Sequence, residues 1–305
     1  MIRSMRTGRK SSIGLALLSA AALFLGACEP VKVTQQRRSA YHMKVGQLYL
    51  EQGQVERALA QFEIALQMNP NLVEAHVEVG NAFNHTGDYR RAHTSYERAV
   101  KLAPTHLEAQ RGLGLMKQLL GLVKEAVKVY LRALAIKLND FQLNDHIASA
   151  YIQLGRAAEA LPYAKRATAL NDLSLGAWAN LAFSYTNSGE YDKAVDAYRR
   201  AIELTDGGEP PVPIVVGLAD AHIRLKHYER AEVVLKNLIR RHPTALGHER
   251  LGYCRFKQRR FQDALASYAG GAEARGRRHR VSQRTGGVPP HPIHSVGPKA
   301  VDQAR

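Results

Sequence analysis

Residues 39–72 and 73–106 carry the same residue types at the same places when they are aligned with an offset of 34 residues. Spacings of three and four residues put these side chains on one face of a helix, so each copy predicts two helices that pack together. Such a unit cannot bury its apolar face alone, so the chain must fold as a stack of similar units. The matched positions are Gly46/Gly80, Tyr49/Phe83, Gly53/Gly87, Ala58/Ala92, Phe62/Tyr96, Ala65/Ala99 and Pro70/Pro104.

The same register continues along the chain. It runs through 107–140, 141–174 and 175–208, is interrupted by the Gly- and Pro-rich stretch 207–211, and resumes at 212–244 and 245–274. The pattern resembles the tetratricopeptide repeat family, in which each unit of 34 residues is a helix–turn–helix. The resemblance implies an all-α fold, a right-handed superhelix (an α-solenoid) of about seven helix pairs over residues 39–274. It also implies that the chain binds protein.

The amino terminus has the form of a secretory signal peptide over residues 1–27. Residues 1–12 contain four basic residues and no acid, and residues 13–27 are apolar or small. This run is shorter than the roughly 20 residues of a membrane-spanning helix. Its end, Leu25-Gly26-Ala27-Cys28, resembles the bacterial lipobox, which implies lipidation at Cys28 and attachment to the membrane through that lipid. Residues 28–38 are then expected to form a polar, lipidated tether, and Glu29, where inner-membrane lipoproteins have Asp, favours the outer membrane, facing the periplasm.

Residues 275–305 are rich in Arg, Pro and Gly and poor in large apolar residues, so we expect a disordered basic tail. Two interpretations stay open: a functional basic arm, or a change of reading frame that removed the capping helix a solenoid needs. The net charge of +16 and the pI near 10.0 suggest nucleic acid or anionic lipid. Part of the excess, however, lies in the first 12 residues and in this tail. The Lys and Arg of the repeats are spread over helix surfaces, so no nucleic-acid partner is expected.

The sequence contains no pattern typical of catalysis. It has no phosphate-binding loop, and Gly112-Leu113-Gly114 follows no predicted strand. The two cysteines, Cys28 and Cys254, are too few for a disulfide framework or a zinc site. We therefore expect a protein that is not an enzyme, with no catalytic residues, metal, cofactor or small-molecule substrate.

In the tetratricopeptide family, the first helix of each pair lines a concave groove. Mapping its positions onto this chain shows that repeats one to five are rich in Asn and Gln, whose amides both donate and accept hydrogen bonds and can hold the backbone of an extended peptide. The Lys and Asn clamp with which some members hold a carboxyl terminus is not matched, since Met43 and Gln47 stand there. The predicted peptide-binding groove residues are Gln47, Asn81, Asn84, Arg111, Gln118, Gln142, Gln153, Phe183 and Asn187.

The order of lipobox, tether and repeat array resembles the pilotin lipoproteins of type IV pilus biogenesis. It implies a lipid-anchored scaffold or adaptor of the bacterial cell envelope that helps a secretion or pilus machine to assemble. Two alternatives remain open at this point. One is a substrate-recruitment adaptor for a separate enzyme, a glycosyltransferase or a peptidoglycan hydrolase, and the other is an anionic-polymer binder acting through the basic tail.

Overall fold

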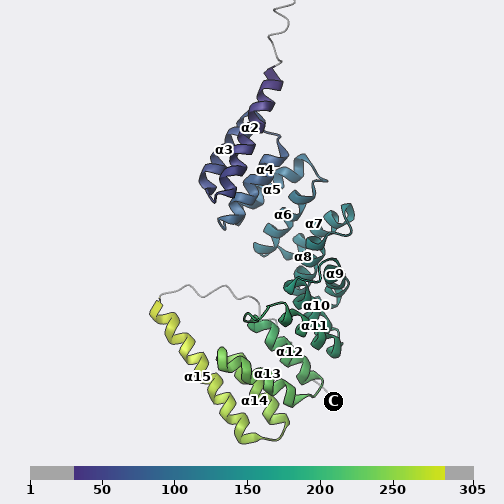
Figure 1. Ribbon diagram of the computed structural model, residues 1–305, viewed down its shortest axis with the longest axis vertical. Helices are drawn as coiled ribbons and strands as arrows, with labels where there is room; N and C mark the ends of the chain where they lie inside the picture. The colour runs from purple at the N-terminus through teal and green to yellow at the C-terminus, as the bar shows by residue number, and fades with distance from the viewer. Residues whose placement is uncertain (1–30, 286–305) are drawn as a thin grey trace, which may run out of the picture. The chain divides into compact units, whose positions relative to one another are not determined.

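The computed structural model describes residues 31–285, and this part of the chain is entirely helical, with fourteen α-helices and no strand (Figure 1). This confirms the predicted all-α solenoid of about seven helix pairs. The pairs are α2 (Val31–Glu51) with α3 (Val55–Met68), α4 (Val73–His85) with α5 (Tyr89–Leu102), α6 (Leu107–Leu119) with α7 (Val123–Ile136), α8 (Phe141–Gln153) with α9 (Ala157–Leu170), α10 (Leu175–Asn187) with α11 (Tyr191–Glu203), α12 (Val212–Arg224) with α13 (Tyr228–Arg241), and α14 (Ala245–Lys257) with α15 (Phe261–Thr285).

The helices belong to two compact units, which divide after Ala109. Unit 1 contains α2 to α5 and the first residues of α6, and unit 2 contains the remainder of α6 and α7 to α15. None of the helices within residues 31–285 has the length and apolarity that crossing a bilayer requires.

The recurring small and aromatic positions hold the two helices of a pair together. A Cβ added at Gly80 of α4 would lie 2.8 Å from Cε1 of Tyr96 in α5, and one added at Gly252 of α14 would lie 2.8 Å from Cε1 of Tyr268 in α15. Glycine therefore lets the ring of the second helix lie directly on the backbone of the first. In the fourth repeat Ala148 and Ala164 stand at these two positions, and both are fully buried. In the fifth repeat, however, Ala182 and Tyr198 occupy these two positions together, and both are buried.

The turn inside each pair needs a left-handed residue. Gly53 and its equivalents at 87, 121, 155 and 189 have φ between 70° and 81°. In the last two pairs the same place is occupied by Lys226 and Arg259, each with φ of 61°, a conformation that costs an L-residue about 1–2 kcal/mol.

Both ends of the array are more helical than the sequence indicated. Helix α2 begins at Val31, so the predicted tether is wrong over 31–38, which is helical. The next residue, Ser39, is buried, and its hydroxyl donates to the carbonyl oxygen of Ala65 at 3.3 Å. The signal segment and Cys28 lie outside the described residues, as does the tail from 286.

The predicted disorder is also wrong over 275–285, because α15 continues to Thr285. Gly270 and Gly271 do not end this helix. A Cβ at Gly270 would lie 2.8 Å from Cε1 of His248, so the glycines allow α14 to approach closely. The helix then continues past Ala274, which is buried, and Arg275, which pairs with Glu249 of α14.

Candidate functional site

The first helices of neighbouring pairs lie against one another. In unit 2, α8 contacts α10, α10 contacts α12, and α12 contacts α14. The second helices of the same described region, α9, α11 and α13, make no such contacts with each other. In unit 1, α2 likewise contacts α4. The first helices therefore form the inner side of each unit, which is the surface on which the sequence places the groove.

Polar side chains link the first helices of unit 1. Gln47 Nε2 of α2 donates to Oε1 of Glu78 in α4 at 2.9 Å. Asn81 Nδ2 donates at 3.2 Å both to Oε2 of Glu78 and to Oε1 of Glu108 in α6. The hydroxyl of Tyr96 donates to Oδ1 of Asn81. The amides of Gln47 and Asn81 are thus engaged in joining one repeat to the next.

A similar set of bonds runs along unit 2. Gln118 Nε2 of α6 donates to Oγ of Ser149 in α8 at 3.3 Å, and its Oε1 accepts from the hydroxyl of Tyr130 at 3.1 Å. Further along, Asn180 Nδ2 of α10 donates to Oδ1 of Asp145 in α8 at 2.9 Å. Burial raises the pKa of Asp145, and the bond from Asn180 partly offsets this.

The last contact between first helices in unit 2 is an ion pair. Arg250 Nε of α14 lies 2.7 Å from Oδ1 of Asp220 in α12. Burial raises the pKa of the Asp220 carboxyl, and Arg250 acts against that rise. We call the polar side chains that join neighbouring first helices within a unit, from Gln47 in unit 1 to Arg250 in unit 2, the seam.

The remaining predicted groove residues do not take part in the seam. Among the described residues, the side chains of Asn84, Gln142, Gln153 and Arg111 make no hydrogen bond, and Gln142 and Gln153 are exposed. Asn187 donates to the carbonyl oxygen of Phe183, four residues earlier in its own helix, at 2.8 Å. The structure therefore separates the predicted residues into structural amides and amides that are free to meet a ligand.

Sequence reasoning missed the partners of the structural amides. Glu78, Glu108, Ser149 and Asn180 lie on first helices but were not among the predicted groove residues, although Glu108 and Ser149 stand at the same repeat positions as Gln142 and Asn81. A detectable signal exists, because each partner is polar and lies 27 to 35 residues from the amide or carboxylate that it meets.

The fourth position of the repeat, held by His76 in α4 and Trp178 in α10, has a structural role. His76 Nε2 bonds to the carbonyl oxygen of Pro70 at 2.9 Å, and Trp178 Nε1 donates to the carbonyl oxygen of Asp172 at 2.8 Å. Both carbonyls lie six residues earlier, so either ring ties its helix to the preceding turn. In residues 31–285 no group of three His, Cys, Asp or Glu side chains is arranged to hold a metal ion.

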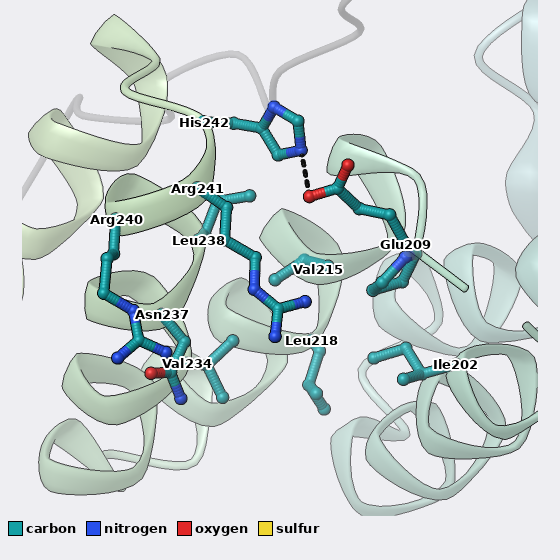
Figure 2. A pocket seen from close by; sticks show the side chains of 11 residues that line it. Ile202, Glu209, Val215, Leu218, Val234, Asn237, Leu238, Arg240, Arg241 and His242 are labelled. Atoms are coloured by element: carbon teal, nitrogen blue, oxygen red, sulfur yellow. Dashed lines mark ion pairs between the residues drawn. The ribbon is translucent and has the colours of Figure 1, made fainter. Parts of the chain in front are cut away.

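The structure also has a pocket that the sequence did not predict. It lies between α11, α12 and α13 in unit 2 and has a volume of about 320 Å³ (Figure 2). None of the predicted groove residues lines it.

Family comparisons match most of the described chain. Models described as "Tetratricopeptide repeat" match residues 85–140 and 216–277, residues 141–172, and residues 176–204, and a model described as "TPR repeat" matches residues 46–86. The unmatched residues 205–215 include the interruption in the register. No curated protein matches the chain significantly.

Solved structures share the fold at low sequence identity. A tetratricopeptide repeat protein from Parabacteroides merdae is 16% identical, with a TM-score of 0.57 over 78% of this chain and 93% of that one. PilF of Pseudomonas aeruginosa is 17% identical, with a TM-score of 0.58 over 69% and 94%. PilW, described as a widely conserved type IV pilus biogenesis factor, is 17% identical, with a TM-score of 0.56 over 66% and 92%. YrrB, described as a TPR protein with an unusual peptide-binding site, is 21% identical, with a TM-score of 0.53 over 60% and 92%. Both the repeat models and the fold lead to one conclusion: the chain is a tetratricopeptide repeat protein.

Proposed function

We propose that this protein is a non-enzymatic scaffold that binds an extended peptide of a partner protein along the first helices of its array. The observation that carries the proposal is the division of the groove amides into two sets. Gln47, Asn81 and Gln118 hold neighbouring repeats together, so the surface keeps its shape. Within residues 31–285 the side-chain amides of Asn84, Gln142 and Gln153 have no partner, so their donors and acceptors suit the alternating N–H and C=O groups of a peptide backbone.

We further propose that the scaffold works at the outer membrane of a bacterial envelope, lipid-anchored at Cys28 and facing the periplasm. The support comes from the sequence, in which Leu25-Gly26-Ala27-Cys28 directly follows a short apolar run. A pilotin-like role in assembling a pilus or secretion machine agrees with the fold shared with PilW. Labelling with a radioactive fatty acid tests the anchor: Cys28→Ser should abolish labelling and release the protein from the membrane fraction. A labelled, membrane-bound variant would contradict it.

The groove is tested by capture of envelope proteins on two sets of variants. Asn84, Gln142 and Gln153 are changed together to Ala, and the control changes Gln67 and Gln262, which are exposed on second helices, to Ala. A partner that binds the wild type and the control but not the triple variant supports the proposal, provided that all three proteins have the same melting temperature. A partner that the triple variant retains would exclude the groove. If the variants were equal and binding weakened only with salt, the basic residues beyond 275 would be indicated instead.

A further inference from the structure

The pocket between α11, α12 and α13 exists because the chain between repeats five and six is unusually long. Four residues, 171–174, separate α9 from α10, whereas eight residues, 204–211, separate α11 from α12. The longer connection turns through Asp206 at φ of 46° and Gly207 at φ of 77°. Its end, Glu209 and Pro210, then forms one wall of the pocket.

The floor of the pocket is aliphatic. Ile202 of α11, Val215 and Leu218 of α12, and Val234 and Leu238 of α13 line it. Val215, Leu218 and Leu238 are each less than 10% exposed, so these side chains also belong to the packed interior of the repeat. A volume of about 320 Å³ is at the small end of the range for ligand sites and has room for one or two aliphatic side chains.

The rim of the pocket is positively charged. Oε1 of Glu209 lies 2.6 Å from Nε2 of His242, so the one carboxylate of the rim is already paired. Figure 2 shows these two side chains meeting at the edge, whereas the guanidinium of Arg241 extends from α13 into the pocket toward Leu218. Within the described part of the chain, Arg240 and Arg241 make no hydrogen bond or ion pair.

The position of these arginines at the end of α13 has a structural explanation, because cations there complement the helix dipole. That explanation does not account for the direction of Arg241, which turns over the apolar floor. Guanidinium groups bind carboxylates with two parallel hydrogen bonds. Asn237, also on the rim, adds an amide that can pair with a peptide backbone.

We infer that this pocket is a second binding site, separate from the first-helix groove, for a peptide segment in which an acidic residue adjoins an aliphatic one. The aliphatic side chain of the peptide packs against Val215 and Leu218 on the floor of the pocket. The carboxylate binds the guanidinium of Arg241, with Arg240 beside it. Charge complementarity selects this occupant, since the rim carries two arginine side chains, unpaired within the described residues, against one carboxylate, Glu209, which is already bonded to His242.

The test is a titration of the full-length protein with three capped dipeptides, followed by NMR of its isoleucine, leucine and valine methyl groups. Acetyl-Glu-Leu-amide should shift the methyl signals of Ile202 and Leu218 saturably. Acetyl-Gln-Leu-amide and acetyl-Glu-Ala-amide should each bind about tenfold more weakly or worse, because one lacks the charge and the other the aliphatic group. Arg241→Gln should weaken the binding of acetyl-Glu-Leu-amide by a similar factor. The control Arg132→Gln, which changes an exposed arginine on α7, should leave that binding unchanged.

Three outcomes would overturn the inference. Equal binding of the Glu and Gln peptides would show that Arg241 recognises no charge, and absence of shifts at Ile202 and Leu218 would show that the pocket takes no such segment. Octanoate binding more tightly than any of the peptides would identify a fatty acid site instead. Asn237→Asp is a second variant at an exposed position, and it should repel the acidic peptide while leaving the melting temperature unchanged.

Discussion

Replacing Gly46 by alanine tests whether ring and backbone compete for one space within a helix pair. In an open helical position this change would stabilise the protein by about 0.5–1 kcal/mol, because glycine loses more backbone freedom on folding. Here the new Cβ would lie 2.7 Å from Cδ1 of Phe62, and that ring is fully buried. Overpacking of a tight interior costs about 1–3 kcal/mol. We therefore expect Gly46→Ala to lower the free energy of unfolding by up to about 2 kcal/mol.

The compensating change is Phe62→Leu. Alone it should destabilise α2 and α3 by about 1–3 kcal/mol, because it leaves a cavity. When Phe62→Leu is combined with Gly46→Ala, the new methyl group occupies the space that the ring has left. The double variant should therefore be more stable, by about 1 kcal/mol or more, than the sum of the two single effects predicts. The array already contains this solution at Ala148 and Ala164.

Hydrogen exchange of the α2 and α3 amides is the appropriate assay, because repeat arrays can unfold locally. The control is Gly176→Ala in α10, where an added Cβ meets only Oγ of Ser174 at 3.9 Å, so that this change should be neutral or stabilising. Exchange is therefore followed in α2 and α3 for Gly46→Ala and in α10 and α11 for Gly176→Ala. The reasoning would be refuted if Gly46→Ala protected its own helix pair as well as Gly176→Ala protects its pair, or if the effects of Gly46→Ala and Phe62→Leu simply added.

Four more outcomes can be measured. Lys226→Gly should raise the free energy of unfolding by about 1 kcal/mol, seen by urea denaturation, because it relieves the left-handed strain at φ of 61°. Glu232→Ala should lower it by about 1–3 kcal/mol, because Arg255, which is only 16% exposed, loses its carboxylate partner and keeps only its hydrogen bonds to the Asp263 carbonyl and the Ser267 hydroxyl. Burial acts to raise the pKa of Glu232, yet hydrogen bonds from its cationic neighbours leave it lowered, so the stabilisation is present above the ordinary Glu pKa and disappears as pH falls through the lowered value. Burial lowers the pKa of His222, so melting temperature should fall as pH drops below the ordinary His value, and less so in His222→Gln. Because burial raises the pKa of Cys254 to about 12, its thiol should react with an aromatic disulfide at pH 8 only after unfolding.

Much of the fold could be predicted from the sequence because the repeat pattern depends on residues that lie close together in the chain. Turn residues such as Gly53, and the spacing of small and aromatic positions within one helix, depend on neighbours a few residues away. The ends of the array were harder. The composition of residues 275–305 predicted disorder, yet α15 continues to Thr285, and Gly270 and Gly271 within it leave room for His248 of the neighbouring helix. The sequence alone does not distinguish a glycine that ends a helix from a glycine that lets a neighbouring helix approach closely.

The candidate groove was predicted as a surface but not as a set of free groups. The sequence identified the Asn and Gln residues on the first helices. Only the structure shows that Asn81 is bonded to Glu78 and Glu108, whereas Gln142 is exposed and unpaired within the described region. Hydrogen bonding between neighbouring first helices depends on the axial offset between those helices, and the sequence of a single repeat does not determine that offset.

By itself the sequence determined the repeat, the helical pairs, their turns and the side on which a groove must lie, since these follow from periodicity within one unit. The tertiary structure alone decided which amides join repeats and which stay free, how far α15 extends, and that the longer connection 204–211 opens a pocket beneath Arg241. Those features arise from contacts between units, where the distance between two side chains depends on packing rather than on their separation in the chain.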